Sequence, residues 1–395
     1  MAIDRTDLDR RLQALVDLLD IPDSLYEKAR ERYVSLGKWL HRKESVVAAF
    51  APAVYPQGSF RLGTVVRPLL RSEEYDLDLV CQMTVDKSTI TQKAVKELVG
   101  REVKAYAEAN GFYDPATETN RCWRLDYADH IRFHMDILPC IPERRAMQVL
   151  LESLAVRASY AQYAVAITDR KHPNYSVISI DWPTSNPRGF ADWFEERMKP
   201  AARARRQLLV ERHIYASVDD VPAYDWRVPL QRAIQILKRH RDVMFKDDQD
   251  GRPISMILTT LAARAYEGEA DLSEALLSIV SKMPGLVNDR RPRIPNPVDP
   301  REDFADKWHK NSRLEENFWL WHSQVQADLT AWAGRLDEHH VRKIAASKFA
   351  ADISEEQARD LASGRASCGA VSTTTAPVVT ITSAPRPWAT DARWD

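Results

Sequence analysis

The sequence is poor in cysteine and has no long apolar run. Its four cysteines lie far apart, and none forms a C-x-x-C pair: Cys81, Cys122, Cys140 and Cys368. This scarcity argues against a zinc ribbon and a disulfide scaffold, and it favours a reducing cytoplasm. No stretch approaches roughly 18 uninterrupted apolar residues, and the first residues include acids where a signal peptide would be basic. We therefore expect a cytoplasmic protein that is neither secreted nor membrane-spanning.

An excess of charge of either sign is also missing. The 56 Lys and Arg residues nearly balance the 57 Asp and Glu residues, which leaves a formal net charge of −1. A polyanion would therefore have to meet a local basic patch, and histone-like coating of nucleic acid is excluded. Hydrophobic residues make up 44% and charged residues 29% of the 395 residues, which is an ordinary globular balance. This length predicts one bilobal unit or two packed domains.

The first half of the chain has the pattern of a mixed α/β core. Leucines recur at helical spacing from residue 8 to residue 19, and Ser24 with Glu27 predicts a capping box for a helix that continues to about Phe50. Alternating residues predict strands, and a helix that ends at a glycine lies between them. The predicted strands are residues 75–82, 121–127 and 130–138, and the helix is residues 91–110.

The second half is predicted to be helical and forms a separate lobe. Its expected helices are residues 188–215, 229–245, 254–267, 271–283 and 303–335. After residue 366 the chain is rich in Ser, Thr, Ala and Pro without periodicity, which is typical of a flexible tail. We therefore predict a core with N-terminal helices over 1–182, a helical lobe over 183–365, a tail over 366–395, and an active site in the cleft between the lobes.

Two acids on one predicted strand indicate a metal site. Asp76 and Asp78 are two residues apart, so both side chains project from the same face of the strand. Two carboxylates on one face repel each other unless a divalent cation with oxygen ligands, Mg²⁺ or Mn²⁺, joins them. Taken alone, the pair also fits a solvated edge strand.

Two further elements strengthen the metal hypothesis. Residues 56–64 form a Gly/Ser-containing turn whose backbone N–H groups suit phosphate oxygens. A third acid, Asp136, stands alone in the apolar strand Phe133–Pro139 and can join the pair if the strands are neighbours. Three acids with a phosphate-binding turn describe two-metal phosphoryl or nucleotidyl transfer. A strand-edge or capping role is the alternative for Asp136.

The order of these elements resembles that of the polymerase-β-type nucleotidyltransferases. Motifs spread over residues 20–335 narrow the resemblance to the bacterial cGAS/DncV-like nucleotidyltransferases, which synthesise cyclic oligonucleotide second messengers in anti-phage signalling. The motifs that carry it are residues 57–64 (QGSFRLGT), 74–78 (EYDLD), 182–190 (WPTSNPRGF), 229–241 (PLQRAIQILKRHR), 253–260 (PISMILTT), 296–297 (NP) and 302–308 (EDFADKW).

The resemblance implies roles for particular residues. Asp76, Asp78 and Asp136 would be catalytic and would bind two Mg²⁺ or Mn²⁺ ions per site. Gly58 and Ser59 would hold the triphosphate of the NTP substrate. The family pattern also assigns Lys238 and Ser255 to these phosphates, although a solvated lysine and a helix N-cap would be the default interpretations. Gln57 and Arg61 flank the turn and either touch phosphate or fix the loop.

The resemblance also implies partners. ATP is the expected substrate, with other NTPs as alternatives, and an operon-encoded effector would sense the product, often with a regulatory protein partner. A linear 2′–5′ oligoadenylate synthase, an RNA-tailing enzyme and a non-catalytic nucleotide or RNA sensor remain open as alternatives. The basic clusters 203–206 and 290–293 could contact nucleic acid, but charge runs between helices are usually solvated and these lack interleaved aromatics.

Overall fold

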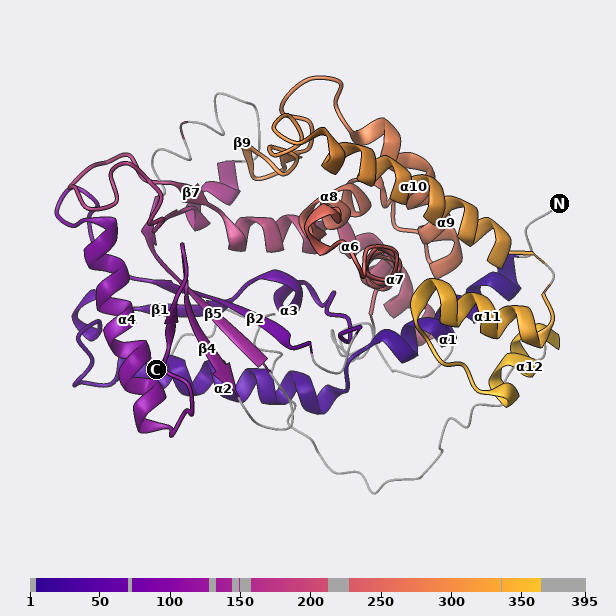
Figure 1. Ribbon diagram of the computed structural model, residues 1–395, viewed down its shortest axis with the longest axis horizontal. Coiled ribbons are helices and arrows are strands. Elements are labelled where there is room, and N and C mark those ends of the chain that lie inside the picture. Colours follow the sequence, from indigo (N-terminus) through magenta and orange to yellow (C-terminus); the bar gives the residue numbers. More distant parts are fainter. Residues whose placement is uncertain are drawn as a thin grey trace. The chain divides into compact units, whose positions relative to one another are not determined.

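The computed structural model in Figure 1 describes two compact units. Its described residues are 5–69, 73–127, 133–143, 149, 158–211, 227–334 and 336–363. One unit contains the main sheet and comprises residues 21–196 and 295–302; the other is helical and comprises residues 1–20, 197–294 and 303–395. Within the described residues no helix is long and apolar enough to cross a membrane.

The sheet unit is built on seven strands. In chain order they are β1 (Ala53–Pro56), β2 (Tyr75–Gln82), β3 (Thr117–Glu118), β4 (Trp123–Tyr127), β5 (Phe133–Pro142), β6 (Val165–Ile167) and β7 (Thr184–Ser185). The spatial order is β1-β2-β5-β4-β3, and β6 joins β5 to β7. Strands β2 and β5 run parallel and the other pairs are antiparallel. The strand predicted at 75–82 is confirmed as β2, and the one predicted at 121–127 is confirmed as β4 from Trp123 onward. The strand predicted at 130–138 is confirmed from Phe133 and continues to Pro142, whereas residues 130–132 lie outside the described residues.

Helices α2 (Asp23–His41) and α4 (Gln92–Ala109) pack against strands of the sheet (Figure 1). Thr91 caps α4, because its hydroxyl accepts a hydrogen bond from the Ala94 N–H at 3.0 Å. Trp123 of β4 lies flat against Gly100 of α4, where an added β-carbon would come within 2.2 Å of the indole ring. Glycine at this position lets helix and sheet approach closely, and the indole N–H donates to the Lys96 carbonyl.

Short elements complete the sheet unit. They are the 3-10 helices η1 (Ala48–Phe50) and η2 (Ala158–Tyr163), the helix α3 (Gly58–Leu62), and the two-stranded sheet of β8 (Pro295–Asn296) and β9 (Asp299–Asp303). The long helix α6 (Pro187–Glu211) begins in this unit and continues into the helical one.

The helical unit contains the remaining elements. They are α1 (Arg5–Leu19), α7 (Pro229–Met244), η3 (Gln249–Gly251), α8 (Ser255–Ala265), α9 (Leu272–Lys282), η4 (Met283–Leu286), α10 (Ser312–Trp332), α11 (Glu338–Phe349) and α12 (Glu355–Ser363). Their core is aromatic and aliphatic, and Phe318, Trp321 and Trp332 are fully buried. The helices predicted over 229–245, 254–267 and 271–283 are confirmed as α7, α8 and α9.

The division of the chain differs from the predicted boundary at residue 182. The first helix belongs to the helical unit, because the buried Arg11 donates to the carbonyls of Trp332 and Gly334 at 2.6 and 2.9 Å. Residues 295–302 return to the sheet unit, where Asp299 accepts a hydrogen bond from the Thr184 hydroxyl at 3.2 Å. Such long-range contacts leave no periodic signal in the sequence. The predicted tail over 366–395 lies outside the described residues.

Three local predictions were wrong. Pro22 takes the N-cap position of α2, so Ser24 is inside the helix and forms no capping box with Glu27. Helix α2 ends at His41, well before Phe50, where Arg42 adopts an extended backbone. The long helix predicted from residue 303 begins only at Ser312, after the β9 strand.

Candidate active site

The strand register places the three predicted acids on one face of the sheet. Asp78 of β2 is directly paired with Asp136 of β5, and Asp76 is paired with His134 one rung earlier. Paired residues in adjacent strands point to the same side, so Asp76, Asp78 and Asp136 share a face. Leu77 and Met135, on the other face, are buried, whereas Asp76 is exposed and the other two acids are half-buried. The condition set for Asp136, that its strand adjoin that of the acid pair, is met.

The predicted phosphate turn is the five-residue helix α3, held directly against Asp78. The Gln57 N–H donates to the Asp78 carbonyl at 2.9 Å, which fixes the start of α3 to the strand. Gly58 has a φ of 65°, and a β-carbon there would come within 2.4 Å of Oδ2 of Asp78. Only glycine therefore lets the backbone approach this carboxylate. The first N–H groups of a helix have no partner within it, so Gly58 and Ser59 present donors beside the acids.

Asp136 is held by an arginine from the neighbouring strand. Arg124 of β4 is paired with Asp136 across the β4–β5 register. Its Nε and Nη2 donate to the two carboxylate oxygens at 2.9 and 2.7 Å. These hydrogen bonds raise the pKa of the Arg124 guanidinium, and the nearby charges of Asp136, Asp76 and Asp126 add to the effect. The third acid therefore carries a bidentate counter-ion that the sequence analysis did not predict.

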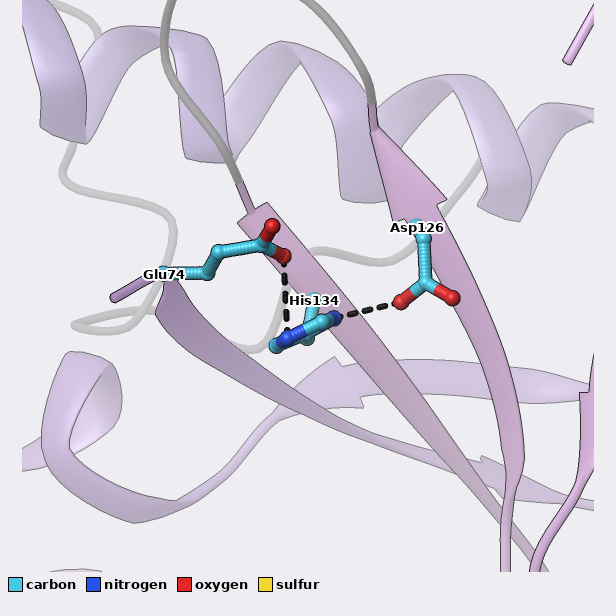
Figure 2. Close-up of side chains that lie close together, drawn as sticks. All are labelled: Glu74, Asp126 and His134. Atoms are coloured by element: carbon cyan, nitrogen blue, oxygen red, sulfur yellow. Dashed lines mark hydrogen bonds and ion pairs between the residues drawn. The ribbon is translucent and has the colours of Figure 1, made fainter. Parts of the chain in front are cut away.

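A second cluster lies beside these acids on the same face. Figure 2 shows His134 between two carboxylates, with Nε2 paired to Glu74 at 2.9 Å and Nδ1 paired to Asp126. The ligand atoms of the three residues lie within 4.8 Å of one another, which is close enough to hold a metal ion. Because each ring nitrogen already faces its own carboxylate, a cation here would have to displace one of the two pairs. The predicted metal ligands did not include these residues.

Cys122 lies close to the same carboxylates. Burial raises the pKa of the Cys122 thiol to about 12, and the negative charges of Asp136 and Asp78 contribute to the shift. At neutral pH this side chain is therefore a protonated thiol and not a thiolate ligand or nucleophile. The site consequently offers oxygen donors.

The donor set of Asp76, Asp78 and Asp136 fits a hard divalent cation. The three acids come from two adjacent parallel strands, so their carboxylates converge without loop movement. Gly58 lets the start of α3 lie directly against the Asp78 carboxylate, where an added side chain would collide with it. Oxygen ligands of this kind suit Mg²⁺ or Mn²⁺.

Arg61 has a partner that fixes the loop. Its guanidinium lies 3.8 Å from the Glu195 carboxylate of α6, and its side chain is 18% exposed. Gln57 contributes the backbone donor to Asp78 described above. These contacts favour the loop-fixing alternative for both residues, and a direct role in phosphate binding stays a prediction.

Lys238 and Ser255 belong to the helical unit, on α7 and α8, which pack together. Lys238 is 7% exposed, so the solvated-lysine interpretation is wrong. Ser255 is the first residue of α8 and Ile254 takes the N-cap position, so the serine is not the N-cap. The Ser255 hydroxyl instead accepts a hydrogen bond from Arg241 at 3.2 Å. Burial lowers the pKa of Arg241, whose main anchor is the Pro253 carbonyl at 2.7 Å.

The cluster Arg290, Arg291 and Arg293 is partly neutralised by acids. Arg293 pairs with Glu315 and stacks near Trp308, and Arg291 lies 3.9 Å from Asp303. These contacts favour the structural interpretation over a nucleic-acid footprint. For 203–206, the helix α6 is described but the side chains lie outside the described residues.

Comparisons with known proteins agree with this geometry. Residues 52–139, which contain the helix α3 and all three acids, match the family description "Cyclic GMP-AMP synthase DncV-like, nucleotidyltransferase domain". The match and the relatives described below confirm the predicted resemblance to the bacterial cGAS/DncV-like nucleotidyltransferases. It is accordingly a nucleotidyltransferase.

Full-length relatives extend the similarity beyond that domain. A c-di-GMP synthase of Roseivirga ehrenbergii is 28% identical over 318 residues, 80% of this chain and 76% of the relative. The cyclic dinucleotide synthase CdnG of Bradyrhizobium diazoefficiens is 25% identical over 344 residues, 81% and 74% of the two chains. Its structure in complex with GTP superposes with a TM-score of 0.63 and 21% identity, covering 90% of this chain and 98% of that one. The predicted fold, a mixed α/β nucleotidyltransferase core with a helical lobe, is confirmed.

Proposed function

We propose that the protein joins NTPs, with GTP as a principal substrate, into a cyclic dinucleotide second messenger. The observation that carries the proposal is the register of Asp78 with Asp136, with Gly58 held against Asp78. This arrangement sets backbone donors for phosphate beside carboxylates for metal ions. GTP replaces the ATP of the sequence-based expectation as first choice, since one relative is a c-di-GMP synthase and another is solved with GTP.

The reaction needs two successive phosphodiester steps. In each, a ribose hydroxyl oxygen attacks an α-phosphorus, an O–P bond forms, the bond to pyrophosphate breaks and the hydroxyl proton is released. The second step, within the linear intermediate, closes the ring. Asp76, Asp78 and Asp136 would hold two Mg²⁺ or Mn²⁺ ions, which when bound neutralise charge on the attacking and leaving oxygens.

The chain's own residues supply orientation. The amides of Gly58 and Ser59 would bind non-bridging phosphate oxygens, and Arg61, held by Glu195, keeps α3 in place. Lys238 would contribute a charge to the triphosphate, and Ser255 would donate a hydrogen bond to it. Because phosphoryl transfer demands little covalent chemistry from the protein, positioning and electrostatics supply most of the rate enhancement.

The biological setting is part of the proposal. We place the enzyme in the cytoplasm, in anti-phage signalling, where an operon-encoded effector responds to the cyclic product. A regulatory protein partner is included, since a relative of similar fold, CdnC of E. coli MS115-1, is solved in complex with a HORMA protein. Direct nucleic-acid binding is not required by this mechanism.

Product analysis tests the function. The purified chain is incubated with GTP, ATP, both, or all four NTPs, with Mg²⁺ or Mn²⁺, and the products are treated with phosphatase and identified by mass. A phosphatase-resistant cyclic dinucleotide containing GMP is the expected product. Phosphatase-sensitive oligoadenylates or elongation of an RNA primer would replace the proposal with a linear reaction. NTP binding without pyrophosphate release would instead favour the non-catalytic sensor.

A further inference from the structure

The third acid of the site has a competitor for its oxygens. Arg124 donates one hydrogen bond to each carboxylate oxygen of Asp136, at 2.9 and 2.7 Å. A bidentate guanidinium–carboxylate pair is a strong charge-assisted contact with fixed geometry. A divalent ion that uses Asp136 must take at least one of these oxygens and would stand next to a positive charge. The Arg124 guanidinium and a metal ion would therefore compete for the negative charge of Asp136.

The arginine is placed so that it can leave. Its side chain is 34% exposed, whereas that of Asp136 is 19% exposed, so the guanidinium can reach water without disturbing the sheet. The aliphatic stem can stay on β4 while the head rotates. The contact is thus reversible, unlike that of a buried structural pair such as Lys96, whose ammonium is held by the carbonyls of Thr119 and Asn120 at 2.5 and 2.7 Å.

The neighbouring residue pair of β4 and β5, Asp126 and His134, limits where the Arg124 guanidinium can move. Asp76 and Asp126 also stabilise the charge of Arg124, but the Asp126 carboxylate is already paired with His134. Figure 2 shows the His134 ring filling the space between Asp126 and Glu74. Leaving Asp136 therefore gives up a bidentate partner, and Asp126 cannot replace it while it stays paired with His134. Displacing Arg124 from Asp136 therefore costs free energy, which cation binding must offset.

We propose that Arg124 is a positioning residue that holds Asp136 in the metal-free enzyme and yields it to the incoming metal ion. Arg124 thereby sets the metal concentration at which Asp136 binds the ion. In the metal-free enzyme it also holds both carboxylate oxygens of Asp136 through hydrogen bonds from the β4 side. This inference rests on the proposed function, because it takes Asp136 to be a metal ligand.

Metal binding in the absence of nucleotide tests the proposal directly. Mn²⁺ is titrated into the nucleotide-free full chain, and the free ion is followed by electron paramagnetic resonance. For Arg124→Met, which keeps the stem but removes the charge, the Mn²⁺ affinity should rise about tenfold or more, the range expected when a charge-assisted competitor is removed. Arg124→Lys, which offers a single point charge, should give an intermediate affinity.

Two controls separate this effect from general charge. Arg121→Met removes a nearby arginine that pairs with Asp169 at 2.9 Å and not with Asp136, so it should change the Mn²⁺ affinity by less than about twofold. In an Asp136→Asn background, Arg124→Met should bring no gain, since the contested ligand is gone. Circular dichroism of each variant verifies that the sheet unit is folded.

Three results of these titrations would overturn the inference. Unchanged or weaker Mn²⁺ binding by Arg124→Met overturns the inference, as does an equal gain from Arg121→Met. A gain that persists in the Asp136→Asn background overturns it too. Product analysis on the wild-type chain decides the proposed function separately, because a cyclic product can form whether or not Arg124 competes with the metal.

Discussion

Gly58 and Asp78 approach so closely that a β-carbon on the glycine would lie 2.4 Å from Oδ2 of the aspartate. The contact joins the start of α3 to β2, and the Gln57 N–H reinforces it by donating to the Asp78 carbonyl. Two requirements meet at Gly58, a φ of 65° and the absence of a side chain. The backbone proposed to bind phosphate and the carboxylate proposed to bind metal are therefore held in direct contact.

Substituting this glycine should damage the site more than the fold. Gly58→Ala adds about 1–2 kcal/mol of backbone strain, and its methyl group must also push the Asp78 carboxylate aside. We expect synthesis to fall by at least about hundredfold, as for loss of a group that orients a metal ligand. Initial rates of pyrophosphate release and thermal unfolding measure the two effects.

Gly111→Ala is the matched control. Gly111 has a φ of 67°, and nothing lies within 4 Å of the position an added β-carbon would take. It should lose similar stability yet keep its turnover. Equal activity losses in the two variants would show that backbone strain, and not contact with Asp78, explains the effect.

Removing one charge from the acid pair should abolish synthesis and preserve the fold. Asp76→Asn and Asp78→Asn keep side-chain volume but weaken cation binding, so turnover should drop by more than about hundredfold. Because Asp76 is exposed and Asp78 is half-buried, no cavity forms and thermal unfolding should change little. Near-normal pyrophosphate release by either variant, with Mg²⁺ or Mn²⁺, would contradict the metal assignment.

The helical unit should lose stability in acid through one buried carboxylate. Burial raises the pKa of Asp328, but hydrogen bonds from His240, Gln324 and Lys348 more than offset it and hold the pKa below its ordinary value of 3.8. As pH falls, the unfolded chain binds this proton first, so stability present above pH 3.8 is lost as pH drops through the folded-state pKa.

Thermal unfolding between pH 7 and pH 2 measures this contribution. Asp328→Asn should lower the unfolding temperature at neutral pH and flatten its decline below about pH 4, because the titrating group is gone. Asp247→Asn is the control, since its side chain is 88% exposed and should leave the profile unchanged. Parallel profiles for Asp328→Asn and the wild type would show that another group governs the acid transition.

Local periodicity made the strands and most helices predictable, but not the partners across strands. Alternation placed Asp76 and Asp78 on one face, and the structure agrees. Arg124 could have been inferred only from the register that sets it opposite Asp136. Glu74 and His134 do continue the two-residue spacing of the acids, which was a usable signal that the prediction left out.

The partner of helix α1 and the start of helix α2 were also harder to predict, because local periodicity carries no information about either. The leucines of α1 predicted a helix but not its partner, which is fixed by hydrogen bonds from Arg11 to residues more than 300 positions away. Likewise, the capping signal at Ser24 and Glu27 lost to Pro22, whose fixed φ already ends the preceding segment. Tertiary contacts decided the first case, and the local constraint of a proline decided the second.

The final prediction separates metal binding from substrate holding, using Asp136 and Lys238. Asp136 should be needed mainly for activating the acceptor hydroxyl, so Asp136→Ala should stop turnover while an NTP with Mg²⁺ still binds through the acid pair and α3. Lys238 is proposed to offer its charge to the triphosphate in ground and transition states alike, so its loss should weaken NTP binding about tenfold as well as slow turnover.

The control addresses the burial of Lys238, which is 7% exposed and would leave a cavity when truncated to alanine. Lys238→Met keeps the aliphatic stem and removes only the charge, so it should reproduce the weaker NTP binding while unfolding near the wild-type temperature. Titration of each variant with a non-hydrolysable GTP analogue and Mg²⁺ makes the comparison. If Asp136→Ala loses NTP binding altogether while Lys238→Met binds like the wild type, the two roles are wrongly assigned and the buried lysine serves the packing of α7.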